Sequence, residues 1–91
     1  MPTNTTLALG QVVITAGALT KVEFLDLLRG LVRHAACDWG DVDEEDKASN
    51  DLSLREGTRI LSAYYSKSRI RFWIITEWDR SATTVLLPEE Y

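Results

Sequence analysis

The stretch that most constrains the fold is RIRFWIITEW, residues 69–78, in which β-branched and aromatic residues occupy both sets of alternating positions. Such a composition predicts a strand whose successive side chains point to opposite faces. Residues 58–66, TRILSAYYS, have the same character, and the Lys-Ser pair between the two stretches suits a hairpin turn. Residues 83–87, TTVLL, supply a further strand, which ends at a proline because proline cannot donate to a ladder. The second half of the chain is therefore predicted to form an antiparallel meander.

The first half of the chain predicts one strand and one amphipathic helix. GQVVIT, residues 10–15, has the composition of a short strand, and the Ala-Gly-Ala that follows is expected to break it. Thr20 and Glu23 have the form of a capping box, and apolar residues then recur at spacings of three and four as far as Ala36. Gly30 lies inside this helix, where it indicates close packing or an early frayed end.

Residues 42–55 are mostly polar and predict a second helix on the surface. The acidic start of this segment complements the positive end of a helix dipole, and Gly57 is a suitable C-terminal stop. The predicted fold is therefore α+β: an antiparallel β-meander of three to four strands with two helices packed on one face. At 91 residues, the chain is expected to form a single domain, residues 1–91.

Cysteine content and the first residues bear on the compartment. Cys37 is the only cysteine, so no intramolecular disulfide can form, and this favours a reducing compartment. The start MPTNTTLALG has neither the basic segment nor the long apolar stretch of a signal peptide or membrane span. A cytoplasmic protein with no membrane partner is expected.

Charge is distributed unevenly along the chain. Residues 38–51 contain seven carboxylates and one lysine, whereas residues 55–80 contain six basic and three acidic residues. The net charge is −4, which argues against direct nucleic-acid binding because phosphate neutralisation needs a basic surface. Aromatic and basic residues that could stack on single strands do occur in the predicted hairpin, but half of each strand must face the core. The molecule is predicted to be electrically two-sided.

The acidic segment invites several site hypotheses. A calcium loop of the EF-hand type fails, since counting from Asp41 puts an aspartate where glycine is needed and a leucine where glutamate is needed. Zinc is equally unsupported with one histidine and one cysteine, so no metal and no cofactor is expected. Trp39 in an acidic turn has two interpretations: it folds back to cap the core, or it anchors an interface.

A second candidate is a small polar site at a strand end. Acidic and basic side chains in ITEWDR, residues 74–80, could meet a histidine and form an acid-base or divalent-metal site for phosphodiester hydrolysis. The simpler reading is a turn with a local ion pair. His34 and Cys37 at the helix end could also form a thiolate-imidazole pair for nucleophilic catalysis. The alternative is that both residues simply complete the end of the helix. The alternative polar site comprises His34, Glu77, Asp79 and Arg80, with Asp38 brought near by the fold.

Four stretches together resemble a known family: LGQVV…GAL, RH…DWGD, GTRILSAY and WIITEWDRSATTVLLPEEY. They are similar to small proteins of plasmids, integrative elements and phages that are labelled plasmid-related. In the family pattern a glycine precedes Asp-Trp-Gly, where this chain has Cys37. The resemblance implies a protein carried by a mobile element.

Proteins of this kind are often inhibitors of host defence, so the resemblance makes an anti-CRISPR protein the expected class. Such an inhibitor would bind a bacterial effector complex as a DNA mimic, because these complexes hold nucleic acid in positively charged channels. It would need no catalysis, and it would be a monomer or homodimer; an antitoxin-like binding partner is a further alternative. The residues expected to contact the partner are Asp38, Trp39, Asp41, Asp43, Glu44, Glu45 and Asp46.

Overall fold

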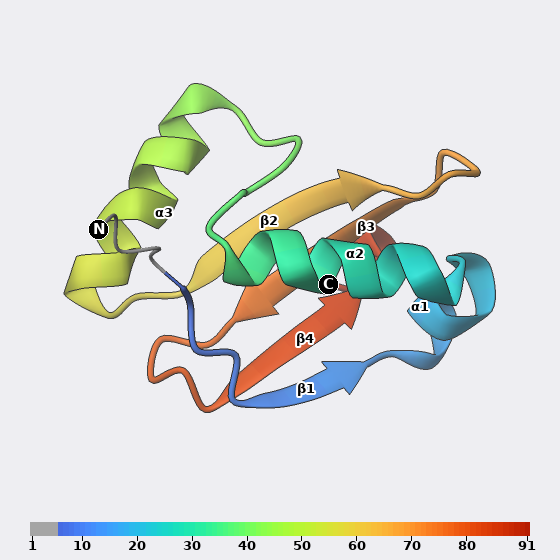
Figure 1. The fold of residues 1–91 in the computed structure, drawn as a ribbon, viewed down its shortest axis with the longest axis horizontal. Coiled ribbons are helices and arrows are strands. Elements are labelled where there is room, and N and C mark those ends of the chain that lie inside the picture. Colours follow the sequence, from blue (N-terminus) through green and yellow to red (C-terminus); the bar gives the residue numbers. More distant parts are fainter. Residues whose placement is uncertain (1–5) are drawn as a thin grey trace, which may run out of the picture.

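A computed structural model describes residues 6–91 and shows four strands, three α-helices and a terminal 3-10 helix (Figure 1). The predicted α+β class is confirmed. Residues 1–5, where the segment predicted to be neither signal peptide nor membrane span begins, lie outside the described residues. None of the helices within residues 6–91 is long and apolar enough to cross a bilayer. The elements are β1 (Gln11–Ile14), α1 (Ala16–Lys21), α2 (Phe24–Ala35), α3 (Glu44–Glu56), β2 (Ile60–Tyr65), β3 (Arg71–Thr76), β4 (Ala82–Leu86) and η1 (Pro88–Glu90).

The sheet is mixed and has the strand order β1-β4-β3-β2. β2, β3 and β4 form the predicted antiparallel meander. The expectation of an antiparallel sheet throughout is wrong at β1, which pairs parallel to β4. The reason is the path of the chain. After β1, the three helices carry the chain over the sheet to the far edge, where β2 begins. The meander then returns toward β1, and its last strand, β4, runs in the same direction as β1.

The segment expected to hold one helix holds two. Ala16, Gly17 and Ala18 do not break the chain but begin α1, because the Thr15 hydroxyl accepts from the Ala18 N–H at 3.1 Å and caps the helix. The predicted capping box is wrong. Thr20 lies inside α1 and donates to the Ala16 carbonyl at 2.8 Å. Glu23 precedes α2 without a side-chain cap, and its carboxylate accepts from the Ser68 hydroxyl across the fold.

α2 lies across one face of the sheet and packs closely on it (Figure 1). Its buried positions are Leu27, Gly30 and His34, which recur at helical spacing. A Cβ at Gly30 would lie 2.8 Å from the Phe72 ring and 3.2 Å from Ile74. The close-packing interpretation of this glycine is therefore confirmed, because a side chain would push the helix away from the core.

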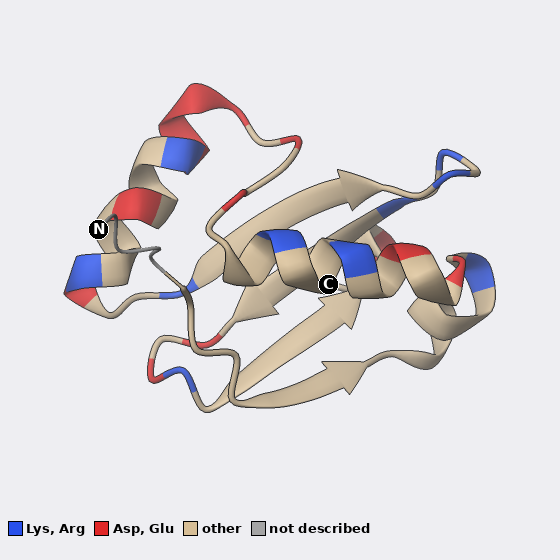
Figure 2. Cartoon of the chain, viewed as in Figure 1, with Lys and Arg blue, Asp and Glu red and all other residues tan. Residues whose placement is uncertain are grey.

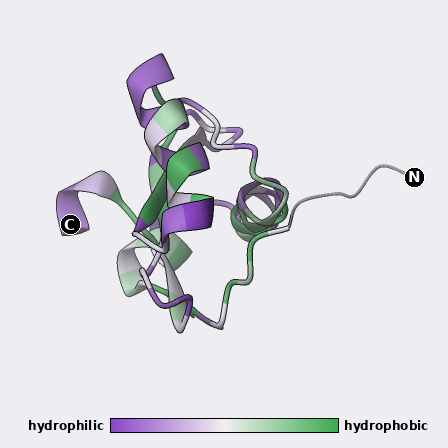
Figure 3. Ribbon diagram, turned by 90° about the vertical axis from the view of Figure 1, so that its left-hand side faces the viewer, coloured by the Kyte–Doolittle hydropathy of each residue, from purple (hydrophilic) through white to green (hydrophobic). Residues whose placement is uncertain are grey.

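α3 does not pack on that face, which corrects the expectation of two helices side by side. Figure 3 shows only α2 standing over its face of the sheet, with the C-terminus on the other side. α3 is mostly polar and lies beside β2, with Leu54 packed against the cluster of Leu7, Trp39 and Ile60. Polar contacts hold it as well. The Asn50 side chain donates to the Leu61 carbonyl at 2.8 Å, and Arg80 donates to the Ser53 carbonyl at 2.7 Å. Because α3 has little apolar surface to bury, these hydrogen bonds supplement the small apolar contact made by Leu54.

Candidate functional site

The Asp-Trp-Gly-Asp turn, residues 38–41, follows α2 and runs beside the outer edge of β2. Asp41 N–H donates to the Ala63 carbonyl at 2.7 Å, and Ala63 N–H donates to the Trp39 carbonyl at 3.2 Å. Gly40 has φ +73°, and a Cβ there would overlap the Ala63 carbonyl oxygen. Only glycine fits both constraints, since left-handed backbone and close approach each exclude a side chain. The turn thus closes one edge of the sheet.

Trp39 is a core residue. Its side chain is 4% exposed and packs with Leu7 and Ile60. The indole Nε1 donates to Asp51 at 2.9 Å, and the ring meets the His34 ring edge-on at a centroid distance of 5.8 Å. The expectation that Trp39 anchors a partner is wrong, and the alternative that it caps the core is confirmed. The indole packs in this cluster together with Val42 and with Leu54 of α3.

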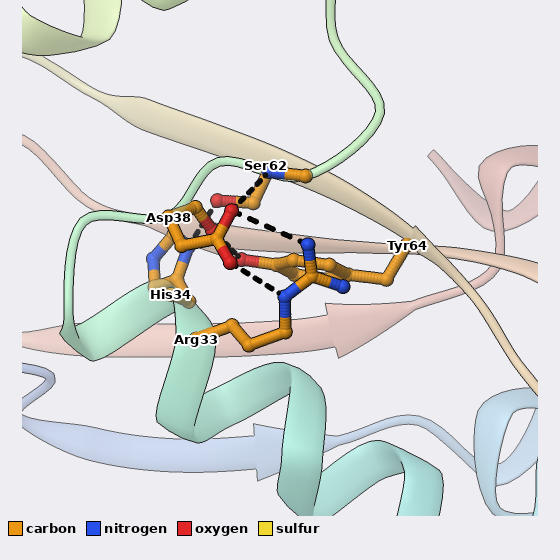
Figure 4. A network of polar contacts seen from close by, with 6 residues as sticks. Arg33, His34, Asp38, Ser62 and Tyr64 are labelled. Carbon is orange, nitrogen blue, oxygen red and sulfur yellow. Dashed lines mark hydrogen bonds and ion pairs between the residues drawn. The ribbon is translucent and has the colours of Figure 1, made fainter.

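The Asp38 carboxylate accepts hydrogen bonds from an arginine and from a backbone N–H of its own turn (Figure 4). Arg33 Nε donates to Asp38 at 2.7 Å and Nη2 at 3.3 Å, and the guanidinium lies 4.8 Å from the Tyr64 ring centroid. The hydrogen bond from Arg33 lowers the pKa of Asp38. Tyr64 OH donates to the Asp38 carbonyl at 2.6 Å. Asp38 is thus an ion-paired carboxylate whose side chain is still 52% exposed, and its predicted contact with a partner stays a prediction.

Asp41 is similarly engaged. Arg71 Nη1 donates to its carboxylate at 3.2 Å, and Nη2 donates to its carbonyl at 3.2 Å. Both residues remain partly exposed, so this pair adds little to stability. It does cancel charge, however. The acidic segment is therefore split, with Asp38 and Asp41 paired to arginines, contrary to the prediction of one free surface.

His34 is fully buried in a chain of hydroxyl groups whose proton directions can be assigned. The Leu9 carbonyl can only accept, so Thr83 Oγ1 donates to it at 2.7 Å. Thr83 has no other proton, so Thr76 Oγ1 donates to Thr83 at 2.7 Å, and His34 Nε2–H donates to Thr76 at 2.8 Å. A neutral imidazole has one N–H. Nδ1 therefore accepts from the Ser62 hydroxyl at 2.5 Å.

The imidazole of His34 is held neutral. Burial, with a smaller contribution from the Arg80 charge, lowers the pKa of His34 to about 4. Both ring nitrogens are used, so neither is free to take a proton from a substrate. This arrangement is suited to specifying how α2 sits on the sheet, and it is not suited to general-base catalysis at neutral pH.

Stability is expected to fall with acid over a defined pH range. The unfolded chain binds a proton at His34 below about pH 6.5 and the folded chain only below about pH 4, so the contribution of His34 is complete above the first value and lost between the two. The loss amounts to about 3 kcal/mol of unfolding free energy. Denaturant titrations across this range test it, and a flat profile between the two pKa values would contradict it. Carboxylates whose pKa is lowered by hydrogen bonds, such as Glu23 and Asp38, lose their contribution as the pH falls through ordinary carboxyl values, so they add to the His34 effect only at the acid end of this range.

The predicted polar site does not assemble. His34 bonds only to hydroxyls, Asp79 accepts from the Ser81 N–H at 3.1 Å, and Glu77 contributes only backbone bonds to the turn. Arg80 donates to the Thr58 carbonyl at 2.6 Å, beyond the end of α3. Among residues 6–91, no group of three or more His, Cys, Asp or Glu side chains is placed to hold a metal ion.

Cys37 does not have the properties of an activated nucleophile. Burial raises the pKa of its thiol, with a further contribution from the Asp51 charge. A reactive cysteine needs the opposite shift, because the thiolate is the nucleophile. The His34 ring nitrogens face Ser62 and Thr76, so the proposed Cys-His pair has no general base.

The first turn of α3 carries the exposed part of the acidic segment, shown in red in Figure 2. The Asp43 side chain caps the helix by accepting from the Asp46 N–H at 2.8 Å. Glu44 meets Lys47 at 3.5 Å but is 92% exposed, and Glu45 and Asp46 are also exposed. We call Asp43, Glu44, Glu45 and Asp46 the acidic helix start.

An exposed apolar stripe on α2 is the other surface feature. Leu25, Leu28 and Val32 point away from the sheet, and Val32 is 69% exposed. They line a shallow depression that Arg29 and Arg33 complete. The periodicity of α2 predicts one broad buried face, and this prediction is wrong for Leu25, Leu28 and Val32 because the apolar face is broader than the sheet can cover.

Sequence reasoning also missed the partners of His34. Ser62, Thr76 and Thr83 lie on three different strands, and alternation places them on the inward face with Ile60 and Ile74. Inward-facing hydroxyls in neighbouring strands are the signal that could have found them, because buried polar groups need partners.

Comparison with protein-family models, curated proteins and solved structures gave no match.

Proposed function

We propose that this chain is a binding protein that inhibits a bacterial defence complex, an anti-CRISPR protein in particular, through the acidic helix start. The observation that carries the proposal is the division of the acidic segment. Asp38 and Asp41 form ion pairs with arginines, while residues 43–46 are exposed at the start of α3. The sequence resemblance supports the choice of partner class.

The inward-facing groups support binding over catalysis. The residues that suggested a catalytic or binding role form hydrogen bonds within the protein. His34 bonds to hydroxyl groups, Asp38 to Arg33, and Trp39 to Asp51. Accessible features include the charge on α3 and the apolar surface on α2. Interfaces combine an apolar centre with polar surroundings, so α2 takes the place first assigned to Trp39 as the apolar contact.

Electrostatics gives the proposal its mechanism. Carboxylates clustered on one helix turn are attracted to the positively charged channels that hold guide and target strands in CRISPR effectors. Complementary charge accelerates association and is screened by salt. The chain would occupy the channel and exclude the nucleic acid, so binding is expected to weaken as ionic strength rises.

Neutralising Glu44, Glu45 and Asp46 together as Gln, Gln and Asn is expected to weaken binding to a purified effector complex about ten- to hundredfold, because each lost charge removes a fraction of a kcal/mol to about 1 kcal/mol. Asp43 stays because it caps α3. Binding is measured by surface plasmon resonance, and inhibition by phage plating on a host with active CRISPR interference.

The matched control removes the same charge elsewhere, as Glu56→Gln, Glu77→Gln and Glu89→Gln in one variant. This control is expected to bind and inhibit like the native chain. Because it includes Glu77, loss of inhibition with native binding in the control would favour the enzyme alternative over the surface proposal. Full inhibition by the variant of the acidic helix start would also overturn the proposal.

A further inference from the structure

The two edges of the sheet are treated differently. At the β2 edge, the Asn50 side chain donates to the Leu61 carbonyl and accepts from the Leu61 N–H at 3.3 Å, as a neighbouring strand would. Gly40 pairs with Ala63 two residues further along. Every outward backbone group in this part of β2 therefore has a partner, and the edge cannot accept another strand.

The β1 edge is open. β1 is the last strand of the sheet, and Figure 1 shows no described segment on its outer side. Gln11 N–H donates to Ser81 and Thr15 N–H to Val85, each at 3.0 Å, so the odd-numbered residues face β4. By the alternation of a parallel ladder, the N–H and C=O groups of Val12 and Ile14 point outward. None of their N–H groups donates to a backbone carbonyl elsewhere in residues 6–91.

β1 is short, with four residues, but it carries none of the side chains that commonly block pairing at an exposed edge. Its sequence, QVVI, contains no charged residue and no proline, the two residue classes that commonly block pairing. Val12 and Val13 are 41% and 44% exposed, one on each face of the sheet. An uncharged strand can pair with a copy of itself without like-charge repulsion, whereas a charged one cannot.

We infer that the chain forms a homodimer in which the β1 strands of two copies pair antiparallel and join their sheets into one. The pairing is centred on Val13, which meets Val13 of the second copy. Val12 then lies opposite Ile14 of the second copy, and the outward N–H and C=O groups of both residues bond across the two-fold axis. The exposed surface of Val12 and Val13 is covered in the same step.

Amide hydrogen exchange of the native chain, followed by NMR at low and high protein concentration, tests the inference. The Val12 and Ile14 amides are expected to exchange at least about tenfold more slowly at high concentration, while Val13, already bonded to β4, shows no comparable change. Sedimentation velocity over the same concentrations should show a dimer. A monomer at all concentrations, or fast exchange at Val12 and Ile14 within a dimer, would overturn the inference.

Two variants distinguish this interface from one on α2. Val12→Pro removes an outward N–H without touching the ladder to β4, and it is expected to give a folded monomer by sedimentation and circular dichroism. Val32→Lys places a charge in the apolar stripe on α2 and is expected to leave the dimer intact. A dimer that survives Val12→Pro, or dissociates in Val32→Lys, would place the interface elsewhere.

Discussion

Replacing His34 with alanine is expected to lower the free energy of unfolding by about 3–5 kcal/mol, because it leaves a cavity under α2 and removes the partners of two buried hydroxyls. Ser62 and Thr76 are both fully buried and bond the two ring nitrogens. The loss is a large share of the about 5–15 kcal/mol that stabilises an ordinary domain. Urea unfolding monitored by circular dichroism measures it.

A milder variant keeps this prediction testable if the alanine variant does not fold. Thr76→Val leaves His34 Nε2–H without an acceptor and is expected to cost about 1–3 kcal/mol. Arg29→Ala, on the exposed side of the same helix, removes only a surface ion pair and should change stability by less than about 1 kcal/mol. Equal stability of the His34→Ala variant and the native chain would contradict the assigned role of His34.

Replacing Gly40 with alanine is expected to cost about 3–4 kcal/mol, more than backbone strain alone. A left-handed residue with a side chain is strained, and the added Cβ would in addition overlap the Ala63 carbonyl oxygen. The turn must then leave the β2 edge, and the Trp39 packing that depends on its position is lost. Thermal or urea unfolding of the variant gives the value.

Gly57→Ala is the matched control for that prediction. Gly57 has φ +72°, nearly that of Gly40, but the nearest atom to an added Cβ is the Trp78 carbonyl oxygen at 4.0 Å. It therefore reports the conformational cost alone, about 1–2 kcal/mol. If the two alanine variants were equally stable, the close contact between the turn and β2 would have no energetic weight.

Much of the fold follows from local signals in the sequence. The meander is predictable because its strands are adjacent in sequence and share an alternating pattern. The end of α3 is predictable because Gly57 is a typical helix stop, whereas the helix starts at Glu44 and not at residue 42 as predicted. The parallel pairing of β1 is not predictable in this way, because its partner β4 lies about 70 residues away and no local pattern specifies strand direction.

The site was harder to predict than the fold. An acidic residue before tryptophan looks the same in sequence whether its carboxylate faces solvent or an arginine. Arg71 reaches Asp41 from β3, 30 residues away in the sequence, so this pairing depends on the tertiary fold. Arg33 and Asp38 are only five residues apart, but their pairing depends on where α2 ends and how the next turn bends. His34 illustrates the same limit, since its partners come from β2 and β3.

The physical picture is a division of the polar residues into inward and outward sets. The inward set fixes the position of α2 and closes the β2 edge, while the acidic helix start and the apolar stripe on α2 stay accessible. Variants of the first set should therefore reduce stability. Variants of the second should reduce binding with little change in stability, since exposed charges contribute little to folding.

The imidazole nitrogen chemical shifts of His34, followed by NMR from neutral pH to about pH 3, test the central claim most directly. The hydrogen-bond chain requires a neutral ring protonated at Nε2 near pH 7, and burial is expected to place the titration midpoint near 4. A ring protonated at Nδ1, or a midpoint near the ordinary value of about 6.5, would contradict the hydroxyl network assigned to His34. It would again make His34 a candidate for acid-base catalysis.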